Sequence, residues 1–214
     1  MPGNEPEEGV TMSNKKTHHS HSRVLVSRSL DERQKVSRNA DSVRERLRNG
    51  TRLIVVDSGE QVIELSDKEL AAATHEWILR IVGMSKVRIH LTAPLPPTAH
   101  IVATGRSFVE VTGHTTVHAY THAIVHAFDQ CTVHARNFAV VSACDSSVAI
   151  AVDDVEIAAY DNARVYASDR VRVTATDSSA VHLSGEAHAS VVRGVRVTGP
   201  ARSNLHVTRP ALHA

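Results

Sequence analysis

A pattern of alternating small apolar and polar residues repeats every eight positions between Ile101 and Gly199. Odd-numbered positions are mostly valine, isoleucine, alanine or another small residue, and even-numbered positions are mostly histidine, arginine, threonine, tyrosine or serine. Alternation with a period of two is the signal of a β-strand, because successive side chains point to opposite faces. The odd positions are therefore predicted to face a core, and the even positions to face solvent.

Three columns of residues define each unit of the repeat. The first column is almost entirely valine or isoleucine, and the second, two residues later, is mostly alanine. The third column is rich in aspartate, asparagine and glycine, which tolerate turn backbone and hydrogen-bond their own main chain. Its members are Gly105, Gly113, Thr121, Asp129, Asn137, Asp145, Asp153, Asp161, Asp169, Asp177, Gly185 and Arg193. A short period kept over about twelve units predicts a solenoid rather than a globular sheet.

Three ways of closing the chain fit this spacing. Two units per coil give a flattened two-sided tube, three give a triangular prism, and short hairpins give an antiparallel meander. Valine over alanine over serine fills only a thin interior, so the two-sided parallel coil is favoured. In that coil His118 and His134 occupy equivalent positions on successive coils, with Cα atoms about 4.8 Å apart.

A charged amphipathic helix is predicted before the repeat, over residues 29–50. Ser29 to Glu32 form a capping box and Asn49-Gly50 is a helix stop. The apolar stripe of this helix is narrow, which suits either a helix of a second copy or the chain's own domain. The stripe, a candidate oligomer contact, consists of Val36, Ala40, Val43 and Leu47. Residues 1–28 are predicted to be a disordered tail.

Residues 51–98 are predicted to form a small α/β cap over the open edge of the first coil. The cap would contain a hairpin of residues 53–56 and 62–65, a helix from Ser66 to near Gly83, and a strand over residues 87–91. The apolar face of that helix would include Trp77. The solenoid is assigned to residues 99–199, and residues 200–214 to an irregular C-terminal tail.

Charge and cysteine content restrict the classes of partner and compartment. The net charge is +1, so the chain lacks a bulk polyanion-binding signature and nucleic-acid binding is not expected. Its two cysteines, Cys131 and Cys144, are expected to be free thiols in a reducing compartment. No apolar run is long enough to span a membrane and no signal peptide is recognised, so a cytoplasmic or virion location is expected.

Histidine is the unusual residue of this chain, with 15 copies. His118 and His134 are the candidate metal ligands, because imidazoles in a row can bind zinc or copper. The alternative is that a solvent-facing strand position accepts histidine as readily as threonine or tyrosine. The aspartates sit at bends, where turn chemistry explains their spacing. We therefore predict no catalytic residue, no cofactor and a non-enzymatic protein.

The tract VHAYTHAIVHAFDQCTVHARNFAVVSACDSS, residues 117–147, resembles the Val-x-Ala-x-Asp-x-Ala-x arrays of short-repeat β-solenoid proteins of bacteria and phages. The resemblance covers nearly half of the chain. It implies a structural or binding role, such as a phage or prophage assembly or surface component, in a homo-oligomer or with a protein partner. A histidine-rich metal- or ligand-binding solenoid is the alternative function, and a carbohydrate-active β-helix is the third.

Overall fold

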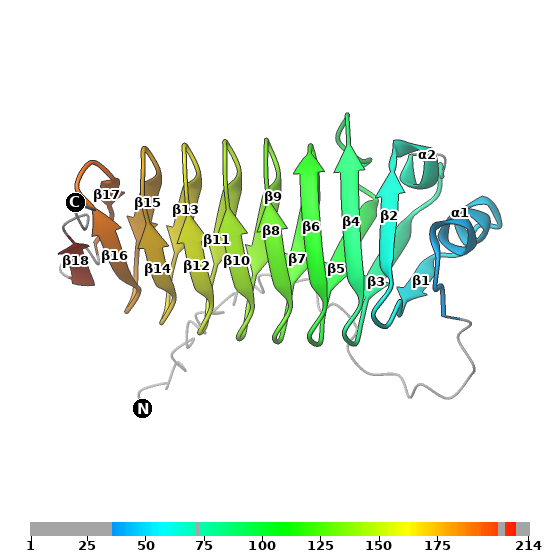
Figure 1. Cartoon of the computed structure of the whole chain (residues 1–214), viewed down its shortest axis with the longest axis horizontal. Coiled ribbons are helices and arrows are strands. Elements are labelled where there is room, and N and C mark those ends of the chain that lie inside the picture. The colour runs from blue at the N-terminus through cyan, green and yellow to red at the C-terminus, as the bar shows by residue number, and fades with distance from the viewer. Residues whose placement is uncertain (1–35, 72, 201–203, 209–214) are drawn as a thin grey trace, which may run out of the picture. The chain divides into compact units, whose positions relative to one another are not determined.

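The computed structural model describes residues 36–71, 73–200 and 204–208. Within these residues the chain forms two nine-stranded β-sheets that face each other, and every strand pair in them is parallel. Consecutive strands alternate between the two sheets, so each pair of strands makes one coil (Figure 1). The predicted mainly β, two-sided parallel solenoid is therefore confirmed, and the antiparallel meander is excluded.

We name the sheets A and B. Sheet A consists of β1 (Leu53–Val56), β3 (Trp77–Ile81), β5 (Ala99–Ala103), β7 (Thr116–Ala119), β9 (Thr132–Ala135), β11 (Val148–Ala151), β13 (Arg164–Ala167), β15 (Ala180–Leu183) and β17 (Arg196–Thr198). Sheet B consists of β2 (Val62–Ser66), β4 (Lys86–Leu91), β6 (Phe108–Gly113), β8 (Ile124–Ala127), β10 (Val140–Ala143), β12 (Glu156–Ala159), β14 (Arg172–Ala175), β16 (His188–Val192) and β18 (Leu205–Thr208).

The interior of the coils is a thin layer of small side chains. Val117 pairs with Val133 and Ala119 with Ala135, so equivalent residues of the repeat stack on each other. Both valines and both alanines are at most 1% exposed. Cys131, at a corner, is also fully buried, whereas Cys144 is half-buried, and both thiols are free as expected. The alternation of odd and even positions in the sequence therefore predicted the buried residues of the coils correctly.

At each corner of the repeat one residue has a left-handed backbone conformation, and its side chain can also hydrogen-bond to the neighbouring coil. The eight non-glycine residues of the turn column, from Thr121 to Asp177, have φ between 53° and 68°. Aspartate and asparagine enter this region more readily than other side chains with a Cβ atom. Their side chains also accept a hydrogen bond from the backbone N–H of the equivalent residue one coil earlier, as Asp153 does from Asn137 at 3.0 Å. We call this series the corner ladder.

The solenoid begins earlier than predicted, at β1 rather than near residue 99. The segments 53–56 and 62–65 do not form a hairpin, because β1 lies in sheet A and β2 in sheet B. Asp57 to Glu60 therefore form a corner of a coil. A turn-rich link between two alternating strands has the same composition in both structures, so the sequence could not distinguish them.

The helix predicted from Ser66 to Gly83 is also wrong over most of its length. Only α2 (Asp67–Leu70) is helical, and it has the expected capping box between Ser66 and Glu69. Trp77, Leu79 and Ile81 point into the core of sheet A from β3, and all three are fully buried. A strand with three large inward residues presents some of the same spacings as an apolar helical stripe, which explains the error.

The N-terminal helix is shorter than predicted and covers the first coil. Helix α1 (Ala40–Arg48) starts at Asn39, whose side chain accepts a hydrogen bond from the N–H of Ser42. The predicted cap at residues 29–32 and the predicted tail over residues 1–28 lie outside the described residues. Before the helix, Ser37 bridges in parallel to Val56, so this end of sheet A is extended by one residue pair.

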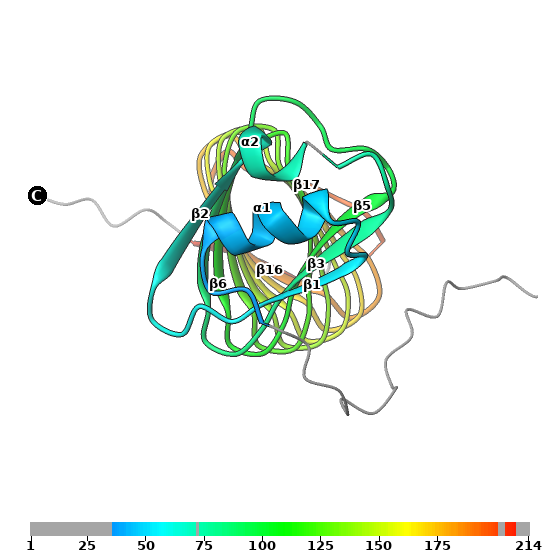
Figure 2. The same cartoon turned by 90° about the vertical axis from the view of Figure 1, so that its right-hand side faces the viewer.

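The apolar stripe of α1 packs against its own chain. Val43 is 0% exposed and Leu47 is 1% exposed, and Ala40 packs on the same core. Figure 2 shows α1 lying across the end of the coils, in front of β1 and β2. Of the four candidate oligomer-contact residues, only Val36 keeps substantial exposure. The second of the two interpretations, packing on the chain's own domain, is the one that the structure shows.

The C-terminal end departs from prediction in one respect. Residues 205–208 were expected to be irregular, but they form β18, which pairs with β16 in sheet B. The inward residues of this last coil are less buried than those before it, and Val207 is 55% exposed. At this end of the described residues, β17 and β18 are the edge strands of their sheets.

Candidate functional site

The two candidate metal ligands meet on the outer face of sheet A. His118 on β7 pairs in register with His134 on β9. Their rings stack with centroids 5.0 Å apart and planes inclined by 17°. His100 on β5 lies beside them, with its ring centroid 6.2 Å from that of His118. The predicted pairing of 118 with 134 is confirmed, whereas His100 was missed because it precedes the regular repeat.

The surroundings of this cluster disfavour protonation. The pKa of His118 is lowered to about 4, mainly because burial penalises its charged form, and further by the positive charges of His134, His100 and Arg136. The pKa of His134 is also lowered, by burial and by Arg136. At neutral pH the two stacked imidazoles are therefore uncharged, and the nearby fixed charge is the guanidinium of Arg136.

The stacked geometry does not converge on a metal ion. A metal bound to imidazole lies close to the ring plane, about 2.0–2.1 Å from the nitrogen. Two nearly parallel planes offset by a stacking distance share no such point, so zinc would require His118 or His134 to rotate. Among the described residues, no group of three or more histidine, cysteine, aspartate or glutamate side chains could hold a metal ion.

Three other histidines at even-numbered positions of this part of the repeat, His114, His122 and His126, do not share this face. His126 lies on sheet B, where its ring meets the edge of Phe108 at a centroid distance of 4.8 Å. His122 lies at a corner and stacks on Phe138, with centroids 5.5 Å apart. His114 is exposed in the turn after β6. All are outward, as predicted, but the two-sided coil distributes them over two sheets and two corners.

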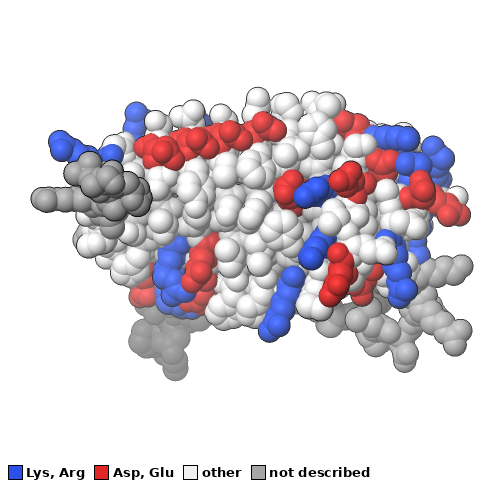
Figure 3. Space-filling view, viewed as in Figure 1, with Lys and Arg blue, Asp and Glu red and all other residues white. Residues whose placement is uncertain are grey.

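A shallow depression of about 330 Å³ lies on sheet B near α2. Arg88 lies at its centre and pairs with Glu64 and Glu110, each at 3.6 Å. Nδ1 of His90, also in the lining, lies 2.6 Å from the hydroxyl of Thr112. Figure 3 shows the charged row of β6, β4 and β2 as alternating red and blue. Both carboxylates are thus partnered by a guanidinium.

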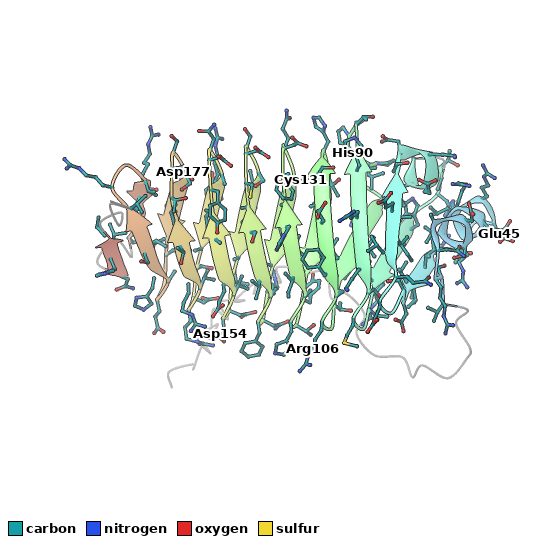
Figure 4. The ribbon with its side chains drawn as sticks, viewed as in Figure 1. Glu45, His90, Arg106, Cys131, Asp154 and Asp177 are labelled. Carbon is teal, nitrogen blue, oxygen red and sulfur yellow. The ribbon has the colours of Figure 1, made fainter. Side chains whose placement is uncertain are left out.

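Further carboxylates on the coils also have defined partners. Asp154, which is labelled in Figure 4, forms a bidentate pair with Arg170 at 2.7 and 2.8 Å. Glu156 pairs with Arg172 on the next coil of sheet B. The opposite corner carries the ladder residues Asp129, Asp145, Asp161 and Asp177, and Figure 3 shows a red stripe along that edge. These carboxylates therefore form structural contacts between neighbouring coils.

Glu69 has the most perturbed carboxylate and joins the two helices. It accepts hydrogen bonds from Ser66 and pairs with Arg44 of α1. These partners outweigh the effect of burial and lower the pKa of Glu69 to about 2. The residue therefore stays ionised and fixes α1 to α2, which is a structural task.

Comparison with known proteins adds no relative to this picture. Neither of the two described helices is long and apolar enough to cross a membrane. No family model, no curated protein and no solved structure matches the chain.

Proposed function

We propose that this protein is a non-enzymatic scaffold, a rigid β-solenoid that presents its flat faces for binding or assembly. The observation that carries the proposal is the use of its acidic side chains. All six aspartates of the corner ladder accept a backbone hydrogen bond from the preceding coil. They are Asp129, Asp145, Asp153, Asp161, Asp169 and Asp177. Carboxylates used in this way stabilise the stack of coils.

The resemblance to short-repeat solenoids of bacteria and phages supports a more specific version of this proposal. In that version the protein is a component of a phage or prophage assembly, found in the cytoplasm or the virion, as a homo-oligomer or with a protein partner. The buried state of Val43 and Leu47 requires that any such contact use another surface than the stripe of α1.

Two measurements on the purified full chain test the scaffold proposal. Light scattering after size-exclusion chromatography gives the number of copies, and the assembly version predicts more than one. Incubation with linear polysaccharides, followed by measurement of reducing ends, tests the enzymatic alternative. The scaffold predicts no release of reducing ends, and release above that of a boiled control would overturn it. A stable monomer would remove the homo-oligomeric version.

A further inference from the structure

The outer faces of the two sheets carry different kinds of charge. No strand of sheet A contains aspartate or glutamate, although three of its strands carry an outward arginine. These are Arg80 on β3, Arg164 on β13 and Arg196 on β17, and a fourth arginine, Arg136, directly follows β9. The strands of sheet B contain Glu64, Glu110 and Glu156 together with Lys86, Arg88 and Arg172. Between Glu76 and the corner aspartates at its borders, the strands of this face carry only cationic charges, which the net charge of +1 does not reveal.

The charges of sheet B are largely neutralised by pairing, whereas those of sheet A are not. Arg88 and Arg172 pair with glutamates on neighbouring strands. None of the four arginines of sheet A forms an ion pair with another described residue. The pKa of His118 on this face is lowered mainly by burial, and the charge of Arg136 makes a smaller contribution in the same direction.

The arginines are spaced along the coil axis. With strands about 4.8 Å apart, Arg80 and Arg136 are separated by about 14 Å along that axis. Arg136 to Arg164, and Arg164 to Arg196, are each separated by about 10 Å. Hydrogen-bonding rings lie between them in one outward column, at His118, His134, Tyr166 and His182. A linear ligand with anionic groups and many hydroxyls along its length matches this arrangement.

The ring geometry favours a glycan over a nucleic acid. Bases bind single-strand platforms by stacking on exposed aromatic faces. The His118 and His134 rings cover one face of each other, and Tyr166 and His182 lie 6.1 Å apart between centroids.

We propose that the outer face of sheet A binds a linear anionic polysaccharide that lies along the coil axis. Arg80, Arg136, Arg164 and Arg196 would hold its carboxylate or sulfate groups by charge-assisted hydrogen bonds. The histidine and tyrosine side chains between them would hydrogen-bond its hydroxyls. The scaffold proposed above would remain if no glycan bound, because its evidence is the corner ladder.

Polygalacturonate is a suitable probe, because its methyl ester provides a neutral polymer with the same backbone. Binding is measured by isothermal titration with the full chain, at about 50 mM and about 200 mM salt. We expect polygalacturonate to bind, higher salt to weaken the binding, and the ester not to bind. The double variant Arg136→Ser/Arg164→Ser should weaken binding about tenfold or more.

The matched control removes the same charge from the other sheet. Lys86→Ser/Arg172→Ser should change the affinity less than about twofold, since surface charges contribute little at a distance. Circular dichroism confirms that both double variants keep the fold. Absence of polygalacturonate binding, or equal loss in the two double variants, would overturn the proposal. A thymidine oligonucleotide that binds more tightly, and is lost with Arg136 and Arg164, would assign the face to nucleic acid instead.

Discussion

The carboxylate of Asp145 accepts a hydrogen bond from the backbone N–H of Asp129, one coil earlier, at 3.1 Å. Asp145 itself has a φ of 54°, so one residue both makes the bend and holds the preceding bend in place. These two roles explain why the turn column is rich in aspartate, although any polar residue at such an exposed position would be compatible with solubility.

Replacement of Asp145 should separate these two tasks. Asp145→Ala loses the acceptor and places alanine in left-handed backbone, so we expect a loss of about 1–2 kcal/mol in the free energy of unfolding. Asp145→Asn keeps the acceptor and tolerates the backbone, so it should stay within about 0.5 kcal/mol of the natural chain. Urea denaturation followed by circular dichroism measures both. Equal destabilisation by the two substitutions would contradict the role of the acceptor.

Gly113 should be irreplaceable for a steric reason that a second glycine lacks. A Cβ atom there would lie 1.9 Å from the backbone oxygen of Leu91, and φ is +79°. Gly50 has a similar φ of +74°, but a Cβ atom would meet nothing within 4 Å. Gly50→Ala should cost about 1 kcal/mol from backbone strain alone, and Gly113→Ala should lower the melting temperature much further. Similar melting temperatures for the two variants would argue against the clash.

Adjacent residues on β13 should respond oppositely to the same substitution. Val165 is 1% exposed inside the coils, whereas Arg164 is exposed on the outer face. Val165→Asp would bury an unpaired carboxylate, which costs several kcal/mol, so the chain should unfold or aggregate. Arg164→Asp should cost less than about 1 kcal/mol. The soluble yield and the circular dichroism spectrum distinguish the outcomes, and equal tolerance would refute the assignment of inside and outside.

Acid should destabilise the protein through His118. Its folded pKa of about 4 lies below the ordinary histidine value of 6.5, so the unfolded chain binds more protons between these values. The stabilising contribution is complete above pH 6.5 and is lost as the pH falls toward 4. Removal of the group by His118→Thr should reduce the loss of unfolding free energy between pH 7 and pH 5. An unchanged pH dependence in the variant would show that this histidine titrates normally.

The carboxylate of Glu69 cannot account for that loss in the same window. Its pKa is lowered to about 2, so its carboxylate stabilises the fold above the ordinary glutamate pKa of 4.5, and the contribution disappears only as the pH falls below that value. Comparison of pH 7 with pH 5 therefore isolates the histidines. His134, whose pKa is also lowered, should add to the effect in the double variant His118→Thr/His134→Thr.

Zinc should bind the natural chain weakly, if the stacked rings keep their arrangement. His118 and His134 cannot both direct a nitrogen at one ion while their planes stay nearly parallel. Isothermal titration with zinc should therefore show no stoichiometric site that is lost in His118→Thr/His134→Thr. A tight site that this double variant abolishes would support the metal-binding alternative and would require the rings to rotate.

The regular part of the fold was predictable because every eight residues repeat the same physical information. Parity gave the inside and outside of the coils, and the thin Val/Ala interior selected two sides over three. From these two features the register of His118 on His134 follows directly. The prediction fails before the regular repeat begins, where Trp77 and its neighbours replace the small inward residues with large ones.

The candidate surface was only partly predictable. The pairing of the two histidines required only the coil length, but the separation of charge between the faces required the true start of the solenoid. Arg80 was assigned to a helix, so it could not be grouped with Arg136 before β3 was known to be a strand. The net charge of the chain is summed over both faces, so it does not reveal that the charged residues of the two faces differ.

The corner ladder makes the protein adjustable in length. Because each ladder residue serves only the coil before it, a coil can be removed or duplicated without leaving an acceptor out of place. Deletion of residues 145–160 would join Cys144 to Asp161, which already occupies the same corner position as Asp145. Gene duplication could therefore lengthen such a rod in steps of about 4.8 Å, and natural variation in reach needs no new architecture.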